Sequence, residues 1–219
     1  MPLRIPYRYI EHPSAKVPDG PVLVMLHGYG SHEEDLFSMR HALFPGFHLL
    51  SLRAPHELPW GGYAWFPIDF TPQGVRINPE EAAATLTELT AAIEEIGKTF
   101  RRPVVMMGFS QGTIMSFGVA LRQPSLIRGV IGFSGRLVSS FSPAVPDPGY
   151  SSIRIIQTHG SMDPVIPVSE GRSASETLKR LGFTHEYREY TFQHEISMNC
   201  LEDVNHWIAV NFNHFTKPE

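Results

Sequence analysis

The stretch that decides the fold is Val104-Val105-Met106-Met107-Gly108-Phe109-Ser110-Gln111-Gly112. Its first four residues are all apolar, which is typical of a strand that helices cover on both faces of a sheet. Residues 114–121 then have the pattern of a helix. The segment between them fits G-x-S-x-G, in which a serine occupies a strained turn and a side chain at either glycine would collide with backbone. The alternative is an ordinary tight turn that happens to contain a serine.

Strand and helix patterns alternate on both sides of this unit. Further apolar runs of strand length occupy residues 22–26, 47–52, 127–133 and 153–158, and a more polar, edge-like run follows at 186–190. Asn78 is predicted to cap a helix with Pro79 in its first turn, and a later helix over 169–181 should end at Gly182. This alternation predicts one α/β domain over residues 1–219, with a mostly parallel twisted sheet and helices on both faces. An antiparallel pair over residues 4–10 would fit its edge.

Composition excludes several classes of function. The formal net charge is −4 and the densest basic spot is Arg101-Arg102, so nucleic acid is not an expected partner. Residues 1–12 carry charges without an apolar signal segment, and the run at 22–26 is too short to cross a bilayer, so we expect no stable membrane insertion. The single Cys200 cannot form an internal disulfide, which favours a cytoplasmic location.

A nucleophilic serine needs a base and a carboxylate that orients it, which in this type of fold follow in the order Ser, acid, His. Two aspartates lie between Ser110 and the C-terminal histidines. Asp147 lies in a Pro-rich stretch, 134–152, with no strand directly before it, whereas Asp163 comes shortly after the predicted strand at 153–158. Asp163 is therefore the predicted acid.

His194 is the predicted base, because it follows the strand at 186–190 and precedes the last helix. We expect the remaining histidines downstream of Ser110 to be structural or exposed: His159, His185, His206 and His214. His194-Glu195-Ile196-Ser197-Met198 begins like the zinc motif H-E-x-x-H, but Met198 stands in place of the second histidine. No metal is therefore expected.

Two backbone N–H groups are predicted to bind the oxyanion of the tetrahedral intermediate. One is that of Gln111, directly after the serine. The other is that of Tyr29, in the segment His27-Gly28-Tyr29-Gly30 that follows the strand at 22–26. A Gly-rich phosphate loop is the competing interpretation, but no Lys-Ser/Thr pair follows these glycines.

With these segments identified, the chain resembles the phospholipase/carboxylesterase family, which includes the acyl-protein thioesterases. The resemblance rests on four segments: Leu26-His27-Gly28-Tyr29-Gly30, Gly108-Phe109-Ser110-Gln111-Gly112, His159-Gly160 with Asp163-Pro164-Val165-Ile166-Pro167, and His194-Glu195-Ile196-Ser197. It implies an α/β-hydrolase domain without a large cap domain, no cofactor, and a monomer or homodimer. The chain departs from the family pattern at Thr113, where a second glycine is common, and at the additional Pro67-Ile68 after Trp65-Phe66.

The predicted function is therefore a serine carboxylesterase that forms an acyl-enzyme on Ser110. Its expected partners are small-molecule carboxylic esters, with thioesters and lysophospholipids as further candidates. Loop aromatic and aliphatic side chains either line the acyl pocket or cover the core: Trp60, Trp65, Phe66, Leu137 and Phe141. Two alternatives remain, namely a serine hydrolase that acts on amides or lactones and a hydrolase-fold binding protein without activity.

Overall fold

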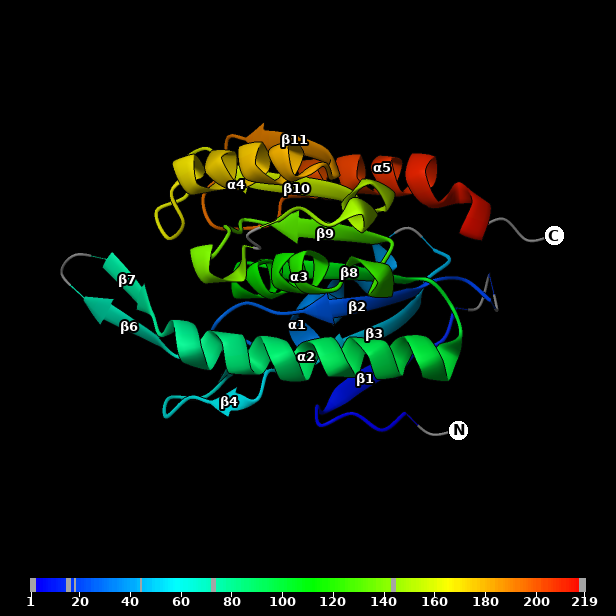
Figure 1. Ribbon diagram of the computed structural model, residues 1–219, viewed down its shortest axis with the longest axis horizontal. Coiled ribbons are helices and arrows are strands. Elements are labelled where there is room, and N and C mark those ends of the chain that lie inside the picture. Colours follow the sequence, from blue (N-terminus) through cyan, green and yellow to red (C-terminus); the bar gives the residue numbers. More distant parts are fainter. Residues whose placement is uncertain are drawn as a thin grey trace.

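A seven-stranded sheet forms the centre of the protein (Figure 1). The computed structural model describes residues 3–14, 17, 19–43, 45–71, 74–142 and 145–216, without the side chains of 70, 71, 74, 75 and 213–216. The strand order is β1-β3-β2-β8-β9-β10-β11. These strands are β1 (Tyr9–His12), β2 (Val22–Leu26), β3 (His48–Leu52), β8 (Val104–Phe109), β9 (Gly129–Phe133), β10 (Arg154–Gly160) and β11 (Thr184–Tyr190).

All neighbouring strands run parallel except β1, which pairs antiparallel with β3. The predicted parallel sheet with one antiparallel edge is therefore confirmed. The edge strand itself lies at Tyr9–His12 rather than at residues 4–10, with Tyr9 opposite Leu52 and His12 opposite Leu49. The polar run near the C-terminus does form the other edge, as β11.

Helices cover both faces of the sheet. Three lie on one face and in front of the sheet in Figure 1: α2 (Pro79–Phe100), α3 (Gln111–Arg122) and α4 (Val168–Leu181). The opposite face carries α1 (Glu34–Ser38) and α5 (Met198–Thr216). The side chains of β2 alternate between the two faces of the sheet. Val24 packs in the hydrophobic core on the side of α2, and Met25 packs in the core on the side of α5. The predicted α/β class is confirmed.

The helix ends follow the sequence signals. The Asn78 side chain accepts hydrogen bonds from the backbone N–H groups of Glu80 (3.0 Å) and Glu81 (3.4 Å), and it donates to the Glu81 carboxylate at 2.9 Å. Gly182 ends α4 with φ of +97°, a conformation in which a side chain would be strained. Both predicted helix boundaries are therefore confirmed.

Several short elements lie outside the predicted pattern. Two small hairpins follow β3, namely β4 (His56–Glu57) with β5 (Tyr63–Ala64), and β6 (Ile68–Thr71) with β7 (Gly74–Ile77). The β6–β7 hairpin projects beyond the sheet (Figure 1). The remaining short elements are the 3₁₀ helices η1 (Met39–His41), η2 (Pro124–Leu126), η3 (Ser139–Phe141) and η4 (Pro148–Ser152), the last two within the Pro-rich stretch.

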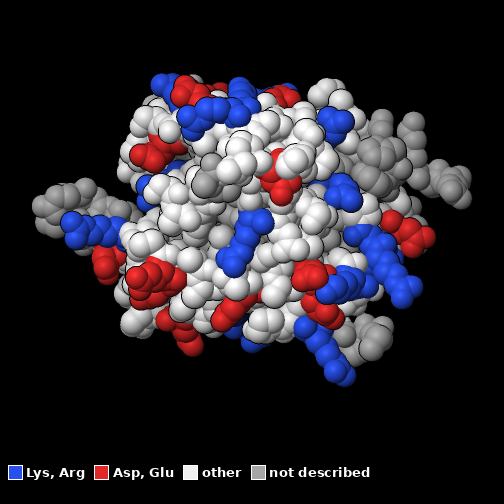
Figure 2. Space-filling model, in the orientation of Figure 1, with Lys and Arg blue, Asp and Glu red and all other residues white. Residues whose placement is uncertain are grey.

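Basic and acidic side chains are interspersed on the face that carries α2, α3 and α4 (Figure 2). Arg172 forms an ion pair with Glu189 at 2.7 Å on this side of the sheet, and Lys98 forms one with Glu94 along α2. Among the described residues, no helix combines the length and the apolar character that crossing a bilayer requires.

A neutral histidine on β11, His185, contacts α4. His185 Nε2 is 3.3 Å from the Gln157 side-chain oxygen, which can only accept a hydrogen bond, so this nitrogen carries the proton. Nδ1 then accepts from the Ser175 hydroxyl at 3.3 Å. Burial, with a smaller contribution from the Lys179 charge, lowers the pKa of His185 to about 4. The folded protein therefore disfavours the charged imidazole.

The substitution His185→Gln is expected to flatten the acid limb of the stability profile. Between pH 6.5 and about 4 the unfolded chain protonates residue 185 while the folded chain does not, so the free energy of unfolding falls as the pH falls. At about 1.4 kcal/mol per pKa unit, this one group accounts for up to roughly 3 kcal/mol. Urea unfolding at stepped pH values measures the effect. The exposed His206→Gln serves as the control, and equal slopes in both variants would contradict the prediction.

Candidate active site

Ser110 occupies a strained turn between β8 and α3. Its backbone has φ +53° and ψ −112°, and its side chain is buried at the first turn of α3. A Cβ at Gly108 would lie 2.4 Å from the carbonyl of Gly112, and one at Gly112 would lie 1.9 Å from the carbonyl oxygen of Leu26. Both glycines are therefore required by close backbone approach, as the sequence predicts, and Ser110 is one of the non-glycine residues with a positive φ.

Thr113 fastens this turn to the neighbouring strand. Its hydroxyl lies 2.7 Å from the Gly108 carbonyl and 2.9 Å from the Phe133 carbonyl, and it accepts the Phe133 N–H at 3.0 Å. The Ser110 N–H donates to the same Phe133 carbonyl at 2.9 Å. The threonine that departs from the family pattern thus ties the serine turn to β9.

Asp163 and His194 meet at the carboxyl end of the sheet. The His194 Nδ1 lies 2.7 Å from the Asp163 Oδ2. The other carboxylate oxygen accepts the backbone N–H groups of Val165 (2.8 Å) and Ile166 (2.9 Å). The Asp163 side chain has no exposed surface, whereas that of His194 is 16% exposed. The structure therefore brings the predicted acid and the predicted base together in a fixed orientation.

The protonation of His194 follows from this contact. A carboxylate only accepts hydrogen bonds, so Nδ1 carries a proton, and in the neutral imidazole this tautomer leaves the lone pair on Nε2. The imidazole ring packs against Phe109, the residue before Ser110, with ring centroids 4.8 Å apart. In the described residues no hydrogen bond joins His194 to the Ser110 hydroxyl, and such contacts commonly tighten only when substrate is bound.

A second histidine contacts the same carboxylate. His159, fully buried at the end of β10, has Nε2 2.9 Å from the Ile166 carbonyl and 3.5 Å from Asp163 Oδ2. The sequence predicts a structural or exposed histidine here, and no local signal places it beside Asp163, because a four-residue spacing brings side chains together only within a helix. Within the described residues, no group of three or more His, Cys, Asp and Glu side chains has an arrangement that could hold a metal ion.

The two predicted oxyanion donors lie on segments that flank Ser110. A Cβ added to Gly28 would be 3.6 Å from Ser110 Cβ, which places the Gly28–Tyr29 peptide beside the serine. Gln111 begins α3, where the first N–H groups have no partner within the helix and the helix dipole is positive. Both segments can therefore present N–H groups to a negative charge that develops next to Ser110.

The five predicted pocket residues lie at different depths. Trp65 and Phe66 have no exposed surface and belong to the core cluster, while Phe141 is 8% exposed. Leu137 is half-buried, and Trp60 is 70% exposed. The Trp65 N–H donates to the Gln111 side-chain oxygen at 2.7 Å. Trp65 and Phe66 thus hold the Gln111 side chain, next to Ser110, through backbone groups, and contact with a substrate remains a prediction for all five.

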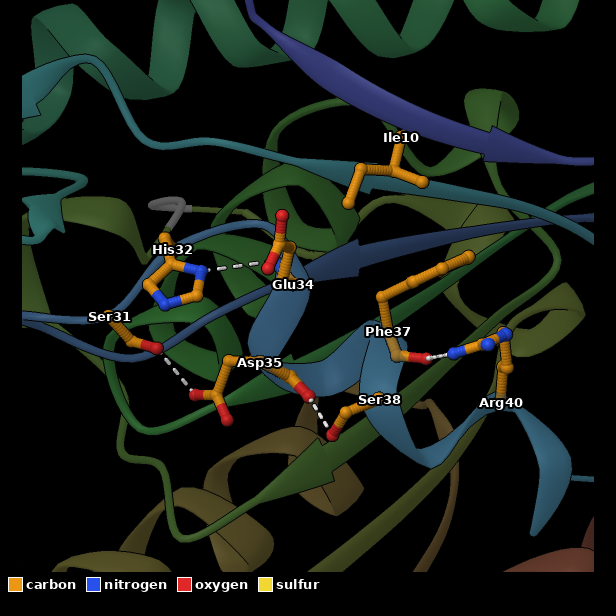
Figure 3. Close-up of a pocket in the computed structure, with 8 residues that line it drawn as sticks. All are labelled: Ile10, Ser31, His32, Glu34, Asp35, Phe37, Ser38 and Arg40. Atoms are coloured by element: carbon orange, nitrogen blue, oxygen red, sulfur yellow. Dashed lines mark hydrogen bonds between the residues drawn. The ribbon is translucent and has the colours of Figure 1, made fainter.

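A hollow beside α1, rather than over Ser110, is shown in Figure 3. Its volume is about 570 Å³, and its polar side chains bond mostly within α1 and the preceding loop, as Ser31 does to Asp35 at 2.6 Å. None of its lining residues is a predicted catalytic or oxyanion residue: Ile10, Ser31, His32, Glu34, Asp35, Phe37, Ser38 and Arg40. Ser110, Asp163 and His194 therefore lie outside this hollow.

The fold and this arrangement define an α/β hydrolase. The serine turn follows β8 in the middle of a mostly parallel sheet, and the acid and the histidine follow β10 and β11. A solved structure with the same architecture is that of esterase PE8, which is 25% identical, has a TM-score of 0.76, and covers 94% of this chain and 98% of its own.

The chain belongs to the phospholipase/carboxylesterase family, whose model matches residues 8–212. It is similar to esterase YpfH of Escherichia coli strain K12, at 25% identity over 90% of this chain and 82% of that protein. It is also similar to acyl-protein thioesterase 1 of Neurospora crassa, with 29% identity over 66% of this chain. The match covers 61% of that relative, which is less than two thirds of its length. Membership of this family therefore rests on a match over nearly the whole chain.

Proposed function

We propose that the protein hydrolyses carboxylic esters, including thioesters, through an acyl-enzyme on Ser110. The observation that supports this most directly is the 2.7 Å contact between His194 and a buried Asp163, close to a strained serine at a helix start. This set of groups is the one that acyl transfer by a serine requires. The names of the relatives, two esterases and one thioesterase, favour the same bond types.

In the proposed mechanism, His194 Nε2 removes the proton of Ser110 as its oxygen attacks the substrate carbonyl. Asp163 holds the imidazole by its Nδ1–H and stabilises the charge that forms on it. The N–H groups of Tyr29 and Gln111 bind the oxyanion, and the leaving group departs with the proton from His194. Water, activated by the same imidazole, then releases the acid and restores Ser110.

Apolar surface beside Asp163 favours substrates with an apolar acyl or alkyl group. Met162 and Val165, which flank Asp163 in one loop, are 55% and 52% exposed. Large apolar side chains exposed this close to reactive groups provide contact area for a hydrocarbon chain. Activity measured over a series of acyl chain lengths, with matched esters and thioesters, would define the preferred substrate.

A fluorophosphonate probe tests the proposal on the full chain. We expect one covalent adduct per molecule, which peptide mass spectrometry places on Ser110, together with hydrolysis of p-nitrophenyl esters faster than of the matching p-nitroanilide. Hydrolysis of a lactone or an amide in preference to the ester would favour a different bond type. A folded chain that neither takes the probe nor hydrolyses any ester would support a binding protein without activity.

A further inference from the structure

His27, directly after β2, has both ring nitrogens in hydrogen bonds with backbone groups. Its Nε2 is 3.1 Å from the Ala54 backbone nitrogen, and its Nδ1 is 2.7 Å from the Gly28 carbonyl oxygen. A backbone N–H can only donate and a carbonyl can only accept, so Nε2 is unprotonated and Nδ1 carries the proton. The ring is 1% exposed, and burial lowers the pKa of His27. The imidazole is therefore neutral, in a single tautomer.

The Gly28 carbonyl that receives this hydrogen bond belongs to the same peptide unit as the Tyr29 N–H. Because a trans peptide is planar, its carbonyl and its N–H point in opposite directions. Holding the carbonyl toward the His27 ring therefore turns the Tyr29 N–H away from that ring. The same peptide lies beside Ser110, since an added Cβ at Gly28 would come within 3.6 Å of Ser110 Cβ.

We propose that His27 is a positioning residue, which fixes the Gly28–Tyr29 peptide so that the Tyr29 N–H is aimed at the oxyanion of the reaction on Ser110. The inference rests on the proposed function and adds a residue that touches neither the substrate nor the reacting atoms. An N–H group that is already oriented stabilises developing charge without reorganising during the reaction. His27 thus stabilises the transition state indirectly, by orienting the Gly28–Tyr29 peptide.

The surroundings of His27 hold the ring and join it to the second oxyanion segment. The Trp65 indole N–H donates to the His27 carbonyl at 2.9 Å, and the two rings lie 5.7 Å apart. The Gln111 side chain accepts a hydrogen bond from the backbone N–H of Trp65 and donates one to the Phe66 carbonyl, each at 2.7 Å. One buried segment therefore supports both the loop that contains Tyr29 and the helix start that contains Gln111.

Two substitutions separate positioning from simple packing. In His27→Asn, the amide nitrogen takes the place of Nδ1 and can still donate to the Gly28 carbonyl. In His27→Gln, the amide reaches the depth of Nε2, where it can accept from the Ala54 N–H. It no longer donates to the Gly28 carbonyl, which keeps only the longer 3.3 Å hydrogen bond from the Ser31 N–H. We expect His27→Gln to lower kcat for a p-nitrophenyl ester by roughly 10–10²-fold, somewhat less than complete loss of an oxyanion donor, with KM nearly unchanged.

His27→Asn should keep kcat within about threefold of the wild-type value, because the oriented peptide is retained. The affinity for an alkylboronic acid, which forms a tetrahedral adduct on serine, should fall in parallel with kcat in His27→Gln only. Thermal unfolding of each variant reports packing separately. If His27→Gln does not fold, His27→Ala supplies the same comparison, because it also lacks the donor.

Equal losses of kcat in the Asn and Gln variants, or a greater loss in the Asn variant, would overturn the role of His27. So would a drop in unfolding temperature with kcat unchanged in the variants that lack the donor. A failure of the proposed function gives a different result, since the wild-type chain would then show neither ester hydrolysis nor a probe adduct on Ser110.

Discussion

Replacing Ser110 by alanine is expected to lower kcat for a p-nitrophenyl ester by roughly 10⁶-fold, to the residual rate that the oxyanion donors and substrate binding alone provide. The loss is this large because no acyl-enzyme can form without the Ser110 oxygen, and His194 then has no hydroxyl to deprotonate. Steady-state hydrolysis, measured at enzyme concentrations high enough to exceed the background rate, gives the ratio. The fluorophosphonate adduct should disappear in the same variant.

Ser134 offers a matched control for this substitution. It follows β9, the strand next to β8, and like Ser110 it has a positive φ, of +48°, and is buried. Its hydroxyl has no hydrogen-bond partner in the described structure. The segment Gly132-Phe133-Ser134-Gly135-Arg136 lacks the final glycine of the motif. Ser134→Ala should therefore keep both the activity and the adduct, and an adduct that survives Ser110→Ala would contradict the assignment of the nucleophile.

Thermal unfolding should differ little between Ser110→Ala and the wild type. The Ser110 side chain contributes no hydrogen bond within the described residues, and alanine carries the same backbone strain at φ +53°. A large fall in the unfolding temperature would mean that the loss of activity reflects unfolding. The probe adduct and the kinetics should then be compared at a temperature where both proteins are folded.

The main elements could be predicted because their signals are local and agree with the fold. Uninterrupted apolar runs, which are typical of strands covered by helices on both faces, predict β2 and β8. Asn78 determines one helix end through its side-chain hydrogen bonds, and Gly182 determines another through its backbone conformation. The β4–β5 and β6–β7 hairpins could not be predicted in this way. Two-residue strands such as His56–Glu57 leave no periodic pattern in a sequence.

The candidate site was predictable as far as strand order dictates it. A serine, an aspartate and a histidine that follow different parallel strands must meet at one end of the sheet, as Asp163 and His194 do. The supporting contacts were not predictable, because they join residues far apart in the sequence. Trp65 contacts Gln111 across 46 positions and His27 across 38, and no pattern in either segment specifies such a contact.

The substitution Asp163→Asn is expected to lower kcat by roughly 10⁴-fold while the site keeps its shape. The reason lies in the two oxygens of the carboxylate. One accepts the N–H groups of Val165 and Ile166, so in the asparagine variant the amide oxygen has to remain there. The amide nitrogen then faces His194 Nδ1, and because this nitrogen can only donate, the acceptor for the Nδ1 proton is lost.

That reversal changes the tautomer of His194. With a donor opposite Nδ1, the neutral imidazole carries its proton on Nε2, and it can no longer accept the proton of Ser110. Activity should therefore fall while the circular dichroism and the unfolding temperature change little. Asp147→Asn is the matched control, because the Asp147 side chain is exposed and accepts from the Gly149 N–H, remote from His194 in the hydrogen-bond network. Equal activities for the two variants would refute the proposed role of Asp163, which is to determine which nitrogen of His194 is free to act as a base.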